Sequence, residues 1–319
     1  MKNKVISIII PGRNEAENLD ELRLRLENLT RKIEKYNFEF IIIDNDSNDN
    51  TKVIIKKFIL NDKRWKYIRF NRNFGLEASF AAGLSHASGD AIVILFSDLQ
   101  DPPELIEQMI RKWEEGYDIV YSIIRKRSDH NLIKKFSAHI MHIVINKMSG
   151  NIIPKNSSDF QLLSRKVVDC VNDLEEKNRY FRGLVHWTGY KKYSIYYDRE
   201  RRKHGKTKFG FFPSLEYALT SLIAFSTYPL IIISYSGMFM ILLSIFLSLI
   251  YMLSKMLVIL FNTSFFTLPP PGWTTIVMLI LFFSGLNNFF IGTIGLYVSS
   301  TYNEVKMRPL FVIDEKINF

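Results

Sequence analysis

From Tyr217 to Asn303 the chain runs for 87 residues with one charged side chain, Lys255. Charge is concentrated before this stretch, because positions 1–216 hold 38 of the 42 Lys and Arg residues and 29 of the 32 Asp and Glu residues. The contrast predicts a charged domain that folds in water, followed by an apolar region in a membrane. A single cysteine, Cys170, excludes an intrachain disulfide framework and a cysteine-cluster zinc site.

Two charge-free runs in this stretch are long enough to cross a bilayer as helices. Leu230–Leu253 has 24 residues and Thr274–Val298 has 25. At about 1.5 Å per residue each reaches roughly 36 Å, against a hydrocarbon core of about 30 Å. Three successive prolines at 269–271 end any helix between them. The sequence therefore predicts a hairpin of two transmembrane helices.

The flanking charges predict the orientation of this hairpin. Lys and Arg precede the first run and follow the second, whereas the connecting loop has only Lys255. By the positive-inside rule, both termini face the cytoplasm, so we predict a multi-pass protein of the inner (cytoplasmic) membrane. The formal net charge of +10 suits anionic lipid or phosphorylated substrates better than nucleic acid, which we do not expect as a partner.

Four parts are expected along the chain: a cytoplasmic domain at 1–208, an interfacial segment at 209–228, the hairpin at 229–300 and a cytoplasmic tail at 301–319. The interfacial segment carries apolar residues at near-helical spacing. This spacing is typical of an amphipathic helix lying in the membrane interface. Packing of the same face against the cytoplasmic domain explains the pattern as well, and both interpretations remain open.

The cytoplasmic domain alternates strand and helix patterns. Val5–Ile10 is a continuous β-branched run, and Glu17–Tyr36 follows with apolar residues spaced 4, 3, 4 and 3 apart. Further strands are predicted at 38–44, 65–70, 91–96 and 118–124, with helices between them. Such alternation indicates an α/β fold, with a parallel sheet covered on both faces.

Polar loops follow three of these strands, at Pro11–Glu15, Asp44–Ser47 and Ser97–Asp101. In parallel sheets ligands bind beyond the carboxyl ends of the strands. A glycine-rich dinucleotide fingerprint and a Walker A lysine motif are both missing from the sequence, which disfavours a dinucleotide enzyme and an NTPase. Acidic side chains at strand ends suit ribose hydroxyls, base N–H groups or a divalent cation that bridges phosphates.

Several stretches together resemble a known family. They are SIIIPGRNEAENL, IIIDNDSNDNT, NRNFG, SDLQDPPELI, DFQLLSRKVV, DRERRKHGKTK and EVKMRPLF. In this order they resemble the family 2 glycosyltransferases of GT-A type, specifically the membrane-anchored polyprenyl-phosphate glycosyltransferases, which include bactoprenol glucosyltransferases and dolichol-phosphate mannose synthases. The resemblance implies a GT-A (Rossmann-like), mostly parallel sheet followed by interfacial helices and a two-helix transmembrane hairpin.

The resemblance also implies roles for individual residues. Nucleotide contacts fall on Pro11, Glu15 and Asp44. A divalent metal, Mg²⁺ or Mn²⁺, falls on Asp98 with Gln100. Asp159 matches the catalytic aspartate. A phosphate monoester is already mostly ionised near neutral pH, so Asp159 is less needed as a base than to orient the acceptor or to stabilise positive charge at the anomeric carbon.

Four basic residues are the candidates for binding phosphate: Arg125, Arg127, Arg202 and Lys208. Their alternative role is to flank a membrane segment next to anionic lipid. The sequence departs from the family pattern at several positions. Phe96 replaces the first acidic residue of the metal motif, so we expect a weakly held metal. Arg13, Asn45 and Gln161 also differ from the usual residues, and Arg13 and Gln161 bear on base and sugar preference.

Taken as a family member, the chain is expected to transfer one hexosyl group with inversion, most simply glucose from UDP-glucose, to a polyprenyl phosphate such as undecaprenyl phosphate. This activity would supply cell-envelope or O-antigen glycosylation. We also expect a membrane and a second copy of the chain as partners. Two alternatives stay open: a catalytically degenerate protein that binds a sugar nucleotide or lipid phosphate, and the same enzyme class with mannose or an aminosugar.

Overall fold

The computed structural model describes residues 4–125, 154–200 and 272–319, together with isolated positions between 233 and 260. Within 272–305 the side chains at 272–275, 277, 278, 281 and 284 are outside the description. The chain forms two compact units, one of residues 1–224 with 306–319 and one of residues 225–305. Each unit is described by itself.

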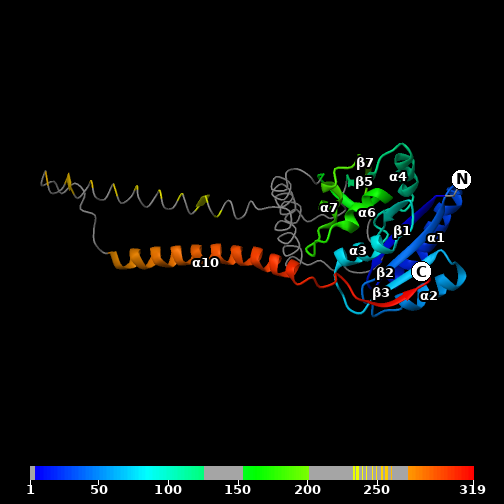
Figure 1. The fold of residues 1–319 in the computed structure, drawn as a ribbon, viewed down its shortest axis with the longest axis horizontal. Coiled ribbons are helices and arrows are strands. Elements are labelled where there is room, and N and C mark those ends of the chain that lie inside the picture. Colours follow the sequence, from blue (N-terminus) through cyan, green and yellow to red (C-terminus); the bar gives the residue numbers. More distant parts are fainter. Residues whose placement is uncertain are drawn as a thin grey trace. The chain divides into compact units, whose positions relative to one another are not determined.

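The first unit is built on a sheet of eight strands in the order β7-β5-β6-β4-β1-β2-β3-β8. Figure 1 shows β5 and β7 at one side of this sheet and β2 and β3 at the other. The strands are β1 (Val5–Gly12), β2 (Asn37–Asp44), β3 (Trp65–Phe70), β4 (Ala91–Ile94), β5 (Ile119–Ile124), β6 (Ser157–Ser164), β7 (Lys192–Tyr197) and β8 (Ile313–Ile317). The central strands β1 to β4 pair in parallel. By contrast, β6 is antiparallel to β4 and β5, and β8 is antiparallel to β3.

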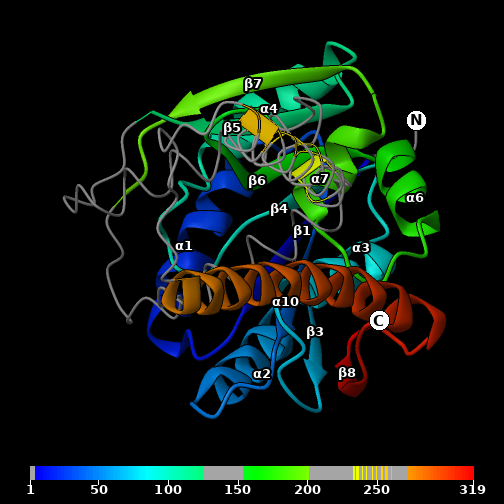
Figure 2. The same cartoon turned by 90° about the vertical axis from the view of Figure 1, so that its left-hand side faces the viewer.

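Helices cover both faces of this sheet. On one face lie α1 (Ala16–Lys32), α2 (Thr51–Asn61) and α4 (Leu105–Glu114), and on the other lie α3 (Leu76–His86), α6 (Arg165–Asp173) and α7 (Phe181–Trp187). Figure 2 shows β1 and β4 between α1 on one side and α3 on the other. In β1, Ile8 packs with the first face and Ile9 with the second. Burial on both faces therefore explains why three successive isoleucines, Ile8–Ile10, stand in this strand.

The structure confirms the α/β class and the alternation over residues 5–124, with element ends that differ by a few residues. The first helix ends at Lys32, four residues before its predicted end. The sheet is mixed, because β6 and β8 run against their neighbours. The segment predicted as a tail supplies β8, which adds an edge strand beside β3 (Figure 1).

The second unit contains α10 (Gly272–Val305), which covers the second predicted span. A helix needs about 20 consecutive apolar residues to cross a bilayer. Among the residues that the structure describes, no helix meets the combined demands of length and apolar character for a membrane crossing. This finding contradicts the predicted multi-pass inner-membrane location. The first predicted span, apart from isolated positions, and the segment 209–228 lie outside the described residues.

Candidate functional site

A pocket of about 370 Å³ opens at the carboxyl ends of β1 and β4. Its lining comes from four segments of the chain, and the residues are Pro11, Gly12, Arg13, Glu15, Asn45, Asn73, Gly75, Leu76, Ser79, Phe96, Ser97 and Asp98. The predicted Pro11, Glu15 and Asp98 are thus brought together in one cavity. Gly12 lets β1 end close to Ser97, because a Cβ at this position would lie 2.8 Å from Ser97 Oγ and the serine side chain would have to move.

Asp44, predicted to contact the nucleotide, does not line this pocket. It is 1% exposed at the end of β2. Its carboxylate accepts hydrogen bonds from the Ser47 backbone N–H at 2.8 Å and from the Tyr67 hydroxyl at 2.6 Å. Burial, and next the bond to Asp44, raise the pKa of the Tyr67 phenol, so Tyr67 stays a donor. In this structure Asp44 organises the loop behind the pocket wall.

Asn45 is a site residue whose role the sequence did not reveal. Its Nδ2 donates to Gly75 O at 2.8 Å, and its Oδ1 accepts from Phe74 N at 2.8 Å. A neutral amide makes both bonds, whereas a carboxylate could not donate to Gly75. Asn45 therefore fixes the loop at 73–75 on the opposite wall of the pocket.

The acidic loop after β4 has a tight turn. Asp98 is 7% exposed, and its Oδ1 accepts from Gln100 N at 3.2 Å across Leu99, which has a positive φ of 57°. Gln100 points its Nε2 toward Glu200 O at 3.4 Å, so its amide oxygen is the end available to a cation. Phe96 lines the pocket and packs edge-on against Phe80, with the two ring centres 6.1 Å apart.

The donor set at this loop fits one hard divalent cation that takes its remaining ligands from a substrate. Carboxylate and amide oxygens are the ligands that Mg²⁺ and Mn²⁺ prefer. Within the described residues, no group of three or more His, Cys, Asp or Glu side chains could hold a metal by itself.

Asp159, the predicted catalytic aspartate, lies on β6 and is paired with Arg182 of α7. Arg182 donates from Nε to Oδ1 at 3.0 Å and from Nη2 to Oδ2 at 2.8 Å. This bidentate fork fixes the direction of the carboxylate. Asp159 does not line the pocket. Arg182 was not predicted, because a contact 23 residues away leaves no local signal in a sequence.

Two more polar side chains are buried on these elements, Gln161 on β6 and His186 on α7. Gln161 is fully buried and His186 is 4% exposed. Neither side chain has a hydrogen-bond partner among the described residues. Burial lowers the pKa of the His186 imidazole to about 3, so the ring is neutral at physiological pH. Its ring packs edge-on against Tyr121 at 5.0 Å.

Of the four predicted phosphate-binding residues, Arg125 alone is among the described residues. It is exposed just after β5, with its guanidinium 5.3 Å from the ring centre of Tyr196. Arg127, Arg202 and Lys208 lie outside the described residues.

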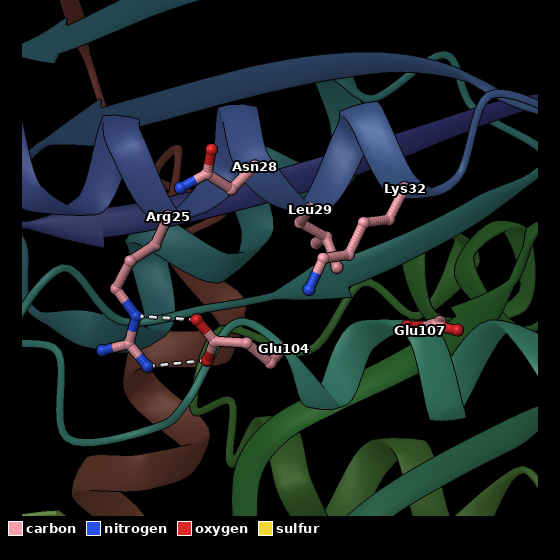
Figure 3. Close-up of a pocket in the computed structure, with 6 residues that line it drawn as sticks. All are labelled: Arg25, Asn28, Leu29, Lys32, Glu104 and Glu107. Carbon is pink, nitrogen blue, oxygen red and sulfur yellow. Dashed lines mark hydrogen bonds and ion pairs between the residues drawn. The ribbon is translucent and has the colours of Figure 1, made fainter.

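A smaller pocket of about 180 Å³ lies between α1 and α4 (Figure 3). Its lining contains none of the predicted site residues: Arg25, Asn28, Leu29, Lys32, Glu104 and Glu107. The Arg25 guanidinium already holds both oxygens of Glu104, at 2.9 and 2.6 Å. The larger pocket at the strand ends is therefore the candidate site.

Comparison with known proteins gives three concordant results. Residues 7–171 match the model of the family described as glycosyl transferase family 2. The chain is 35% identical to an uncharacterized glycosyltransferase of Synechocystis over 97% of this chain and 95% of that one. It is 34% identical to a prophage-derived bactoprenol glucosyl transferase of Shigella flexneri over 97% of each. A glucosyl-3-phosphoglycerate synthase from Mycobacterium tuberculosis shares the fold, with a TM-score of 0.51, 14% identity, and coverage of 69% of this chain and 76% of that one.

Proposed function

The chain belongs to glycosyl transferase family 2, and from that membership we propose that it transfers one glucosyl group from UDP-glucose to a polyprenyl phosphate such as undecaprenyl phosphate, with inversion. Glycosyl transfer itself follows from the family. The acceptor class rests on one observation: near full-length identity of 34% to a transferase that is named for bactoprenol, a polyprenol. That agreement covers both compact units of the chain.

The pocket at the strand ends supports a nucleoside diphosphate sugar as the donor. Glu15 offers a carboxylate suited to ribose hydroxyls, and Pro11 supplies a wall at the end of β1. Asp44 does not line the pocket but supports its wall, by accepting hydrogen bonds from Ser47 and Tyr67. The pocket volume of about 370 Å³ is within the range of small-molecule sites.

Asp98 and the Gln100 amide oxygen would hold Mg²⁺ or Mn²⁺ against the donor diphosphate. A cation bound there neutralises charge on the leaving nucleoside diphosphate. Because Phe96 supplies no ligand, the chain offers one carboxylate, and the cation depends on donor phosphates and water for the rest. The protein therefore holds it weakly until the donor binds.

In the transfer, an acceptor phosphate oxygen forms the new bond to the anomeric carbon while the bond from that carbon to the donor diphosphate breaks. The bonding electrons leave with the nucleoside diphosphate. Asp159, kept in one direction by Arg182, orients the acceptor or stabilises positive charge at the anomeric carbon. Arg125, with Arg127, Arg202 and Lys208, is proposed to bind the acceptor phosphate.

A labelled-donor assay tests this function. The purified chain would be incubated with undecaprenyl phosphate and with UDP-glucose, UDP-N-acetylglucosamine or GDP-mannose. We expect label from UDP-glucose in the organic extract, and Asp159→Asn to remove most of it. Asp169→Asn, which changes an exposed aspartate on α6, is the matched control and should leave transfer intact. Label found only in water-soluble product would contradict the acceptor assignment.

A catalytically degenerate binding protein is favoured by one observation, the aromatic side chain of Phe96 where an acidic ligand is expected. This alternative predicts that UDP-glucose binds in the presence of Mn²⁺ but that neither transfer nor hydrolysis follows. Equilibrium binding measured beside the transfer assay separates the two functions.

A further inference from the structure

The end of β7 is held against the acidic loop by contacts that the proposed reaction does not use. Asp101 directly follows Gln100 in the acidic loop, and Tyr197 and Arg199 lie at the end of β7. The Tyr197 hydroxyl donates to Asp101 Oδ1, and Arg199 Nε forms an ion pair with the same oxygen at 3.3 Å. The two segments are almost 100 residues apart in the chain, so this contact ties together two distant parts of the domain.

Asp101 is fully buried, unlike most aspartates. Its second oxygen, Oδ2, has no hydrogen-bond partner among the described residues. Burying an incompletely bonded carboxylate destabilises a fold, and an apolar residue of similar size would avoid the penalty. A role in packing alone therefore does not explain an aspartate at this position.

A second layer of contacts surrounds this buried one. Glu200 N donates to Gln100 O at 3.1 Å, and Gln100 Nε2 approaches Glu200 O at 3.4 Å. Arg25 of α1 binds Glu104 through two hydrogen bonds, as Figure 3 shows, and lies 3.7 Å from Glu200. Residues 197–200 are thus fastened to the acidic loop through side chains and backbone.

The acidic loop needs such support because its conformation is strained. Leu99 has a φ of 57°, a region that a branched apolar side chain seldom adopts. Strained residues persist only where the surroundings determine their conformation, and Leu99 is also buried in the core. The contacts at Asp101 hold the loop on its other side, next to the proposed metal ligands.

We propose that Asp101 is a positioning residue that, through Tyr197 and Arg199, holds the Asp98–Gln100 loop in the geometry that binds the metal and the donor diphosphate. The inference rests on the proposed function and deepens it. Asp101 itself does not line the candidate pocket.

Binding of a Mn²⁺–UDP probe to the full chain, measured by calorimetry, tests this role without depending on the acceptor. Tyr197→Phe removes one hydroxyl and keeps the ring. We expect it to weaken Mn²⁺–UDP binding roughly tenfold, the effect of losing one hydrogen bond to a charged group. Arg199→Gln should do the same, and Arg199→Lys should recover part of the affinity. Arg111→Gln, at an exposed ion pair on α4, is the matched control and should bind as the wild type does.

Three outcomes are decisive. Weakened binding in both variants, with thermal unfolding close to that of the wild type, supports the positioning role. Wild-type affinity in Tyr197→Phe and Arg199→Gln overturns it, because the contact would then serve stability alone. A wild-type chain that binds no Mn²⁺–UDP overturns the proposed donor class, and the inference that rests on it, before any variant is compared.

Discussion

The side chain at position 96 bears on the metal site that we propose. Phe96 lines the pocket and packs against Phe80, so the loop offers Asp98 as its carboxylate there. We predict that Phe96→Asp lowers the Mn²⁺ concentration that gives half-maximal transfer, because a second anionic ligand makes the cation less dependent on the donor. Titration of activity with Mn²⁺ measures the effect.

Phe96→Leu is the matched control, because it loses the same ring contact without adding charge. It should keep the metal requirement of the wild type. A wild-type enzyme that stays fully active in a strong chelator would contradict the idea and would assign neutralisation of the diphosphate to arginine or lysine.

His186 predicts a dependence of stability on pH. An unfolded histidine takes up its proton near pH 6.5, whereas the buried imidazole does so only near pH 3. The unfolded state therefore binds more protons between these values, so stability falls as the pH drops through this window. Within this window the free energy of unfolding falls by about 1.4 kcal/mol per pH unit because of this group.

We expect His186→Phe, which keeps the edge-on contact with Tyr121, to flatten the slope of unfolding free energy against pH below 6.5. Urea unfolding at several pH values measures it, and parallel curves for the two proteins would refute the prediction.

The sequence predicted which residues gather at the candidate site better than it predicted their contacts. Pro11, Glu15 and Asp98 were predicted from loops after strands, and the structure brings them into one pocket. The local sequence pattern could not predict that the Tyr67 hydroxyl donates a hydrogen bond to Asp44, or that Arg182 donates one to Asp159. Each of these contacts joins segments 23 residues apart, and strand periodicity carries no information on such pairs.

At the scale of elements, strands β1 to β5 were predicted from the sequence, whereas β6, β7 and β8 were not. Strands buried on both faces are mostly apolar, and the runs Ile8–Ile10 in β1 and Phe40–Ile43 in β2 mark them in the sequence. β8 reads Ile-Asp-Glu-Lys-Ile, a polar pattern typical of an exposed edge. Only its pairing with β3, more than 240 residues earlier in the chain, makes it a strand.

Because β8 covers the edge of β3, we predict that deletion of residues 312–319 destabilises the full chain by about 3 kcal/mol or more. The loss combines ladder hydrogen bonds at about 1 kcal/mol each with the contacts of Ile313 and Ile317. Glu315→Gln is the comparison, because it removes only the partly exposed pairs with Lys52 and Lys56 and should cost less than about 1 kcal/mol. Denaturant unfolding of both variants measures the difference. Equal losses would show that β8 contributes only its ion pairs.

At the scale of the whole molecule, the charge distribution separated the chain near the boundary that the structure gives. The charge-poor stretch begins at Tyr217 and the second compact unit at Phe225. The step from that division to a location in the membrane is the one that the structure contradicts, since no helix among the described residues meets the requirement for crossing.

Ligand-linked stability tests how metal and donor depend on each other. A ligand that binds only the folded state stabilises it by RT ln(1 + [L]/Kd), which is about 2.7 kcal/mol at a hundredfold excess over Kd. If Asp98 and Gln100 hold the cation only together with donor phosphates, Mn²⁺ alone and UDP alone each give a small rise in melting temperature. Both together should give a rise larger than the sum, because each completes the other's site.

The measurement is a thermal melt of the full chain with Mn²⁺, UDP or both, with uridine as the control that lacks the diphosphate. Asp98→Asn should remove the excess over the sum and leave the rise with UDP alone. Strictly additive shifts in the wild type would show that the cation has a site independent of the donor, and would rule out the shared coordination proposed for this loop.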